Sequence, residues 1–99
     1  MLITKDIFDS PFLFRKWCEK LKPVYACDTE TTSLHWLELD LIGFSLFDGK
    51  QACYVNLVSN KYRQELLDIL KEQIDKAKLV IFHSAPFDLM VLRKVGIEI

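Results

Sequence analysis

The sequence predicts a single α/β domain in which helices flank a mixed sheet of three antiparallel strands and one parallel strand. Short apolar segments rich in strand-forming residues alternate with amphipathic segments of helical period. The Asp48-Gly49 pair, between two apolar segments, is typical of a β-hairpin turn. The 99 residues, of which 51% are hydrophobic, suffice for one core and exclude two independent domains.

The first part of the chain predicts a helix followed by a strand. Ser10 and Pro11 suit an N-cap and a first helical turn, and apolar residues then recur at helical spacing until Pro23. Residues 24–27 form a compact apolar segment of strand-forming residues. We expect this segment to be a buried central strand that leads directly into Asp28.

The middle of the chain predicts a hairpin and then the clearest helix. Residues 41–47 and 51–57 are typical of strands, so three strands are expected to be antiparallel neighbours. Ser59 and Asn60 are suited to cap the next helix. Apolar residues share one face of this helix and charged residues the other.

The last part predicts a strand and a final helix. We expect residues 79–82 to form a buried strand, parallel to the first strand because a helix connects it back to the sheet. The final helix is expected to begin near Ser84 and to end with Gly96 at its C-cap. His83, at the end of the strand and beside apolar residues, is expected to be packed and hydrogen-bonded.

Three carboxylates are the candidate functional residues. Asp28 and Glu30 lie two apart at a strand end, so both side chains are expected on one face, where a divalent cation would relieve their repulsion. Asp88 follows the parallel strand, and strand ends of this kind carry the sites of open α/β sheets. The alternatives are that Asp28 caps a turn, that Glu30 faces water, and that Asp88 favours the helix dipole.

Two segments carry a family resemblance. Residues 24–34 (VYACDTETTSL) and 83–96 (HSAPFDLMVLRKVG) resemble the first and second motifs of the 3′→5′ proofreading exonuclease domain of bacterial DNA polymerase I, a ribonuclease H-like exonuclease. The resemblance covers nearly the whole chain. It implies a ribonuclease H-like fold and metal-dependent hydrolysis of DNA from a single-stranded 3′ end to nucleoside 5′-monophosphates.

The resemblance also implies roles for the carboxylates. Two divalent cations, Mg²⁺ or Mn²⁺, would be bound. Asp28 and Glu30 would hold the cation on the side of the nucleophile. Asp28 would also bridge to the second cation, which Asp88 would support.

Substrate contacts are implied at four positions. Leu34 would wedge against the terminal base, and Thr29, Ser84 and Phe87 would lie against the bound strand. Ser84 stands where the polymerase family usually has Asn, and Pro86 stands where it often has a basic residue. Both departures weaken the expected contacts with DNA.

The resemblance covers two of three family motifs. The third, an Asp with a nearby Tyr or His, lies downstream of the second, and after Asp88 the only acidic residue of this chain is Glu98. We therefore expect residues 1–99 to form a partial, truncated exonuclease domain, completed by a C-terminal segment or a linked polymerase module. Two alternatives stay open, a catalytically inactive remnant or assembly module and an RNA-processing exonuclease like ribonuclease D.

Charge, cysteines and hydropathy limit the function classes. Lys and Arg number 13 against 14 Asp and Glu, and a net charge of −1 provides no general basic field for a phosphate backbone. The three cysteines are widely separated, which favours buried free thiols in a reducing compartment. The apolar segments are too short to span a membrane and the N-terminus is unlike a signal peptide, so a cytoplasmic protein is expected.

Overall fold

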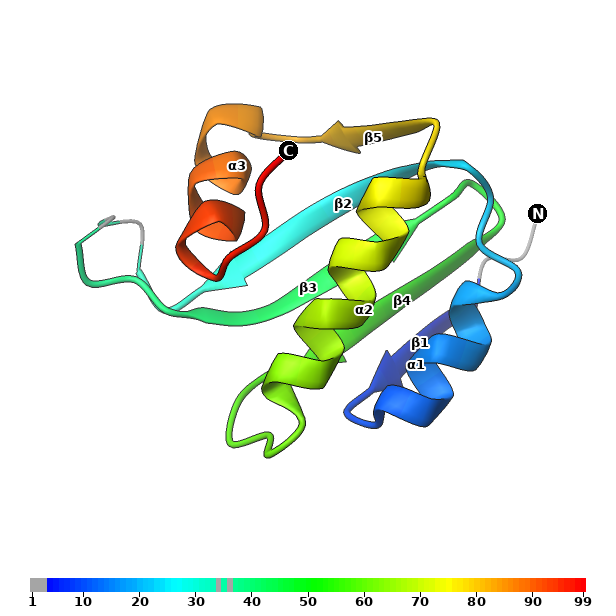
Figure 1. Cartoon of the computed structure of the whole chain (residues 1–99), viewed down its shortest axis with the longest axis horizontal. Helices are drawn as coiled ribbons and strands as arrows, with labels where there is room; N and C mark the ends of the chain where they lie inside the picture. The colour runs from blue at the N-terminus through cyan, green and yellow to red at the C-terminus, as the bar shows by residue number, and fades with distance from the viewer. Residues whose placement is uncertain (1–3, 34, 36) are drawn as a thin grey trace.

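A computed structural model describes residues 4–33, 35 and 37–99, and Figure 1 shows its α/β arrangement. In chain order the elements are β1 (Thr4–Phe8), α1 (Pro11–Cys18), β2 (Val24–Thr31), β3 (Leu41–Phe47), β4 (Gln51–Asn56), α2 (Arg63–Lys76), β5 (Leu79–Phe82) and α3 (Ala85–Lys94). The predicted fold class is confirmed. None of the helices in these residues is long and apolar enough to cross a membrane.

The five strands form one mixed sheet in the order β1-β4-β3-β2-β5. β3 is antiparallel to both β2 and β4, and β5 is parallel to β2, as predicted. The sequence did not predict β1, which pairs in parallel with β4 at the sheet edge. Its short segment, TKDIF, lacks a clear apolar alternation, so pairing across the sheet defines this strand.

Two strands differ from expectation in ways that affect the site. β2 continues to Thr31, so Asp28 and Glu30 lie within the strand and not after it. β5 was expected to be buried, and this prediction is wrong. Leu79 and Ile81 are 55% and 50% exposed, because β5 is an edge strand of which only one face is covered.

The helix ends follow the predicted signals in two cases out of three. Ser10 caps α1 by accepting a hydrogen bond from the Leu13 amide at 3.4 Å, and Gly96 follows α3 with a positive φ of 89°. The third expectation is corrected, since Tyr62 occupies the N-cap position of α2 without a side-chain cap. Asn60 instead accepts a hydrogen bond from the Tyr62 amide at 2.9 Å.

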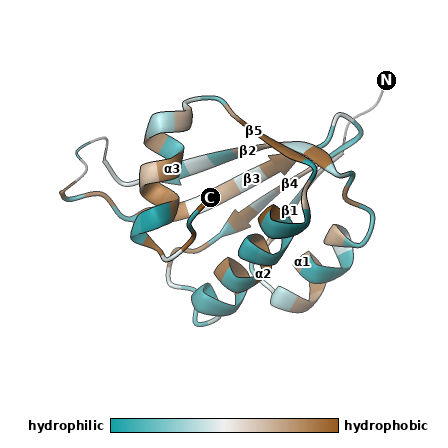
Figure 2. Cartoon of the chain, turned by 45° about the horizontal axis from the view of Figure 1, so that its top comes forward, coloured by the Kyte–Doolittle hydropathy of each residue, from teal (hydrophilic) through white to brown (hydrophobic). Residues whose placement is uncertain are grey.

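One face of the sheet, here called the covered face, carries the core. Figure 2 shows the outward side of α2 as mainly hydrophilic and β5 as mainly hydrophobic. Phe14 of α1 packs edge to face with Phe44 of β3, their ring centroids 5.6 Å apart. Tyr25 and Cys27 of β2 belong to the same buried cluster as the apolar side of α2 and Val91 of α3.

The opposite side, here called the open face, follows from strand alternation and register. It carries Val24, Ala26, Asp28 and Glu30 of β2, Gly43, Ser45 and Phe47 of β3, Tyr54 of β4, and Leu79 and Ile81 of β5. Six of these side chains are more than a third exposed and apolar or acidic, so this face is accessible to solvent.

Candidate functional site

Asp28 and Glu30 project from the open face of β2. Burial alternates along the strand, so that Cys27 and Thr29 are buried while Asp28 and Glu30 are exposed. This is the period of two that places residues i and i+2 of a strand on one side. Two carboxylates therefore share one accessible sheet surface.

A pocket of about 430 Å³ lies at Asp28. It is lined by Ala26, Cys27, Asp28, Ser45, Phe47, Ile81 and His83. Phe47 and Ile81 are 40% and 50% exposed, so the pocket combines a carboxylate with accessible apolar surface. This mixture suits a ligand that has both charged and apolar parts.

His83 differs from its expectation of a packed, hydrogen-bonded imidazole. It is exposed and lines the pocket at Asp28. The reason is that β5 is an edge strand whose exposed residues, Leu79 and Ile81, continue in alternation to residue 83. A strand in the interior of the sheet would have buried this residue, and the wrong expectation for His83 follows from the wrong burial of β5.

Asp88 lies on the covered face, away from the other two carboxylates. It is 2% exposed. Its Oδ1 accepts a hydrogen bond from Thr29 Oγ1 at 2.6 Å, and its Oδ2 accepts one from the Ser84 amide at 3.3 Å. Because Thr29 points away from Asp28 and Glu30, the expected convergence of three carboxylates is not present. Within residues 4–33, 35 and 37–99, His, Cys, Asp and Glu form no group of three suited to a metal.

The hydrogen bonds of Asp88 give it a structural function. Asp88 lies in the first turn of α3, where a carboxylate also interacts favourably with the helix dipole. Thr29 and Asp88 join α3 to β2 through a short buried hydrogen bond to a charged acceptor. This matches the alternative interpretation in which Asp88 supports the start of the helix.

Three of the four residues for which DNA contacts were implied are described by the structure, and they lie in different places. Thr29 is buried under α3 and bonded to Asp88. Ser84 is exposed next to His83, and Phe87 is half-buried against the core. Leu34 lies outside the described residues, and its contact stays a prediction.

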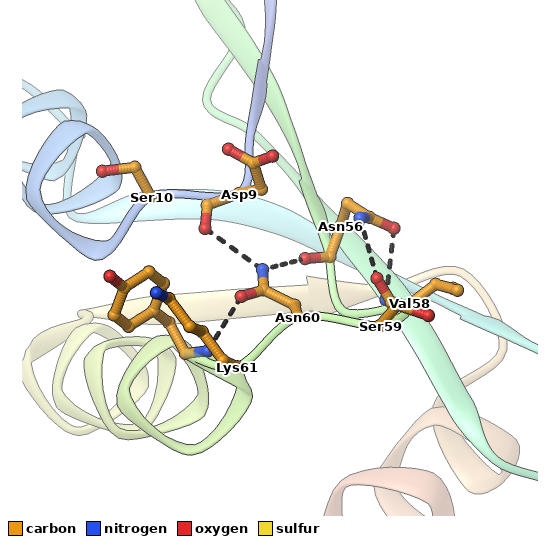
Figure 3. Close-up of a pocket in the computed structure, with 8 residues that line it drawn as sticks. Asp9, Ser10, Asn56, Val58, Ser59, Asn60 and Lys61 are labelled. Carbon is orange, nitrogen blue, oxygen red and sulfur yellow. Dashed lines mark hydrogen bonds between the residues drawn. The ribbon is translucent and has the colours of Figure 1, made fainter.

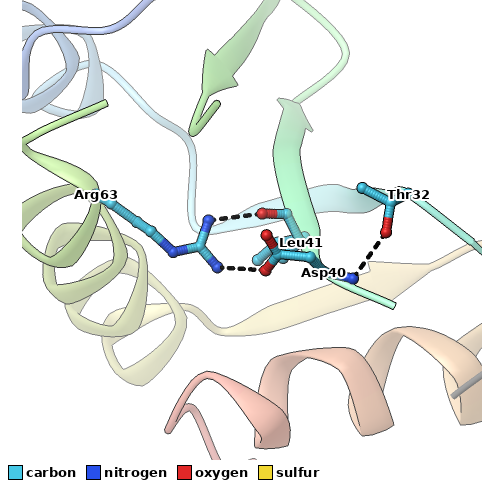
Figure 4. A network of polar contacts seen from close by, with 4 residues as sticks. All are labelled: Thr32, Asp40, Leu41 and Arg63. Atoms are coloured by element: carbon cyan, nitrogen blue, oxygen red, sulfur yellow. Dashed lines mark hydrogen bonds and ion pairs between the residues drawn. The ribbon is translucent and has the colours of Figure 1, made fainter. Parts of the chain in front are cut away.

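A set of polar contacts, here called the loop clamp, closes the connection between β2 and β3 (Figure 4). The Thr32 amide donates to the Asp40 carbonyl, and the Asp40 amide donates to Thr32 Oγ1, both at 3.0 Å. Arg63 of α2 donates to the Leu41 carbonyl at 2.6 Å and pairs with Asp40 Oδ1 at 3.3 Å. The clamp fixes the end of β2 that carries Glu30.

A second polar pocket, of about 460 Å³, lies between the β1–α1 and β4–α2 connections (Figure 3). Asn60 Nδ2 donates to the carbonyls of Asp9 and Asn56, at 3.1 and 2.8 Å. Asn56 in turn bonds to the backbone of Val58. These amides are used to hold the two connections together, so we assign this pocket a structural role.

Gly43 and Tyr54 are residues of the open face that the sequence analysis did not select. A Cβ on Gly43 would collide with the hydroxyl and ring of Tyr54, so the phenol lies across β3 at this point. The available signal was an isolated glycine inside an apolar strand, which often marks a close approach by another group.

The comparison with protein families agrees with the resemblance of the two motifs. The family model described as 3′-5′ exonuclease matches residues 6–99, which includes β2 with its two carboxylates and α3 with Asp88. The match extends over nearly the whole sequence. The chain therefore belongs to the 3′-5′ exonuclease family.

Proposed function

We propose that this chain provides the cation-binding strand of a metal-dependent 3′→5′ DNA exonuclease of the proofreading type found in DNA polymerase I. The reaction would release nucleoside 5′-monophosphates from a single-stranded 3′ end. One observation carries the proposal. In a chain of the 3′-5′ exonuclease family, Asp28 and Glu30 lie exposed on the same face of one strand.

The donor chemistry of the two carboxylates fits a hard divalent cation. Mg²⁺ and Mn²⁺ prefer oxygen ligands. Neither Asp28 nor Glu30 takes part in an ion pair with another residue that the structure describes. Since two carboxylates on one surface repel each other, a cation between them would lower the free energy of the site.

Bound divalent cations would supply a Lewis acid for the phosphate and would lower the pKa of the attacking water. The residues of the chain would bind and orient the DNA. Asp28 and Glu30 would hold the cations beside the scissile phosphate. Phe47 and Ile81 would offer apolar surface to the terminal sugar and base, since both line the pocket at Asp28.

In this proposal Asp88 acts from the covered face. Asp88 is 2% exposed and its two oxygens accept hydrogen bonds from Thr29 and Ser84, so its carboxylate is closed to solvent and to a cation on the open face. We therefore propose that Asp88 holds α3 against β2 and that a completing segment or a partner chain supplies a third carboxylate. The absence of a third acidic ligand beside Asp28 and Glu30 in the described part of the chain supports this.

The test is the hydrolysis of a 5′-labelled single-stranded DNA with Mg²⁺ or Mn²⁺. We expect shortening from the 3′ end that stops in EDTA and in Asp28→Asn and Glu30→Gln. The matched control is Asp68→Asn, because Asp68 is an exposed carboxylate on α2, outside the open face. Cleavage that persists in Asp28→Asn, or that needs no metal, would contradict the proposal.

Two alternatives have distinct outcomes in the same experiment. Faster shortening of an RNA of the same sequence would favour an RNA-processing exonuclease like ribonuclease D. The observation behind the second alternative, an assembly module, is the exposure of Leu79 and Ile81 on β5, since exposed apolar surface can mark a partner interface. A folded chain that binds no Mn²⁺ and cleaves neither substrate would support the assembly module.

A further inference from the structure

We propose that Tyr54 is a positioning residue for Glu30, because its phenol crosses β3 over Gly43 and donates its hydroxyl proton toward the Glu30 carboxylate. This inference rests on the proposed function, since it concerns how Glu30 is oriented to receive a cation. Tyr54 does not itself touch the reacting atoms in this proposal.

The strand register brings the two side chains to the same place. Glu30 of β2 lies directly opposite Gly43 of β3. Tyr54 of β4 lies opposite Ser45 and is therefore the diagonal neighbour of Gly43. Diagonal neighbours on one face of an antiparallel pair are within reach of an aromatic side chain. Tyr54 can thus extend across β3 from the side opposite to Glu30.

The absence of a side chain at Gly43 gives the phenol its room. An added Cβ at this position would overlap the hydroxyl oxygen and Cζ of Tyr54, and would also crowd the Val55 carbonyl. The Tyr54 hydroxyl therefore occupies the space where residue 43 would otherwise carry its Cβ. Only glycine at this position leaves the path from β4 toward β2 clear.

This placement sets the separation between Tyr54 and Glu30. Cβ atoms of directly opposed residues in antiparallel strands are about 4.5–5.5 Å apart. The Tyr54 hydroxyl, standing at the missing Cβ of residue 43, is then at about that distance from the Glu30 Cβ. A glutamate carboxylate lies two bonds beyond its Cβ, so its oxygens are within hydrogen-bond reach of the hydroxyl.

Electrostatics agree with a neutral phenol acting as the donor. Burial and, secondly, the negative charge of Glu30 raise the pKa of Tyr54 above its ordinary value. A tyrosine hydroxyl is an ordinary hydrogen-bond donor near neutral pH, and a hydrogen bond to a carboxylate is stronger than one between neutral groups. Asn56 lies directly opposite Gly43. Its side-chain amide forms hydrogen bonds with the backbone of Val58, just beyond the end of β4.

The first experiment measures the contact without metal, as a double-mutant cycle on the full chain. We expect Tyr54→Phe to lower the urea midpoint in the wild-type background and to leave it unchanged in the Glu30→Ala background, where residue 30 has no side-chain acceptor. The phenylalanine keeps the ring over Gly43 and removes only the hydroxyl. Equal shifts in the two backgrounds would overturn the proposal, because the hydroxyl would then not act on Glu30.

The second experiment measures Mn²⁺ affinity by electron paramagnetic resonance of the free ion. Removing a partner that orients a metal ligand typically weakens binding by about 10–100-fold, and we expect about 10-fold for Tyr54→Phe. Gly43→Ala, which displaces the phenol, is expected to weaken binding in the same way. Tyr62→Phe is the matched control, since Tyr62 is exposed at the start of α2, and it should change the affinity by less than twofold.

The two experiments separate this inference from the proposed function. If Glu30→Gln weakens Mn²⁺ binding and Tyr54→Phe does not, the positioning role is wrong and the cation site stands. If Asp28→Asn binds Mn²⁺ as tightly as the wild type, the proposed cation site itself is wrong. In that case, a coupling energy between Tyr54 and Glu30 in the metal-free cycle would still establish their hydrogen bond. The hydrogen bond would then have no role in binding a cation.

Discussion

Carboxylates lie on both faces of β2, and the two faces use them differently. On the covered face, Thr29 and Asp88 form a buried hydrogen bond that joins α3 to the sheet. On the open face, Asp28 and Glu30 are exposed, and Asp28 lines a pocket. A carboxylate on one face thus stabilises the fold, and on the other it is available to a ligand. The difference shows that the face of the sheet on which an acidic residue lies decides its role as much as its identity does.

The largest expected effect comes from truncating one phenylalanine on each face of β3. Phe44 is completely buried against Phe14, whereas Phe47 is 40% exposed at the Asp28 pocket. We expect Phe44→Ala to lower the free energy of unfolding by about 3–5 kcal/mol and Phe47→Ala by about 1 kcal/mol or less. Urea denaturation measures both, and equal losses would show that the open face is covered in solution.

The next effect concerns the hydrogen bond between Thr29 and Asp88. Thr29→Val keeps the shape of the side chain and leaves a buried carboxylate oxygen without its donor. We expect a loss of about 2–3 kcal/mol in the free energy of unfolding, because an unsatisfied buried charge is costly. Thr32→Val, at an exposed position, is the comparison and should cost less. If Thr29→Val leaves the free energy of unfolding unchanged, Asp88 accepts a hydrogen bond from another donor in the variant.

The buried thiol of Cys27 on the covered face predicts that the free energy of unfolding falls at alkaline pH. Burial raises the pKa of Cys27 to about 12, from about 9 in the unfolded chain. Between these values the unfolded state loses the thiol proton and the folded state keeps it, so stability is full below pH 9 and falls as pH rises. The expected slope is about 1.4 kcal/mol per pH unit for each such thiol.

The pH dependence is measured by urea denaturation at pH 8 and pH 10. Cys18, whose pKa burial likewise raises to about 12, contributes in the same direction. Cys27→Ala should reduce the fall in the free energy of unfolding by the amount expected for one buried thiol. An unfolding free energy that stays constant over this interval would indicate that Cys27 is accessible to solvent in the folded state.

The smallest effect is expected from neutralising a carboxylate on the open face. Asp28→Asn removes one of two like charges on an exposed surface, so the free energy of unfolding should change by no more than about 0.5 kcal/mol. The same substitution at position 88 removes a buried, hydrogen-bonded charge and should destabilise the protein clearly. Calorimetry of Asp28→Asn and Asp88→Asn compares the faces directly, and a marked loss in Asp28→Asn would show that Asp28 is needed for folding.

Local patterns were sufficient to predict most of the fold. The hairpin, the three helices and the parallel strand β5 follow from turn residues, caps and periodicity that lie within each segment. β1 was not predicted, because this strand is defined by its pairing with β4, which is distant in the sequence. The exposure of β5 escaped it as well, since an apolar strand of four residues has the same sequence pattern at an edge as in the interior.

The site was predictable only as far as strand alternation extends. The spacing of Asp28 and Glu30 correctly places both on one face. Asp88 was expected beside them because the ends of β2 and β5 meet at one edge of the sheet, but this does not determine the face on which α3 packs. That side is decided by the packing of α3 into the core, which no local pattern contains. The family match confirms the resemblance, and the roles of the individual residues stay proposals.

Because the loop clamp joins both ends of residues 33–39, the pairing of β2 with β3 does not depend on the length of this segment. Thr32, Asp40 and Arg63 join the ends of residues 33–39 by backbone and side-chain contacts. A longer segment would begin and end at the same atoms, and each doubling of its length would cost only about 0.6 kcal/mol of closure entropy. The exposed side of this segment at Leu37, which is 63% exposed, is therefore a suitable insertion point for a peptide tag or a fluorescent reporter that leaves Asp28 and Glu30 in place.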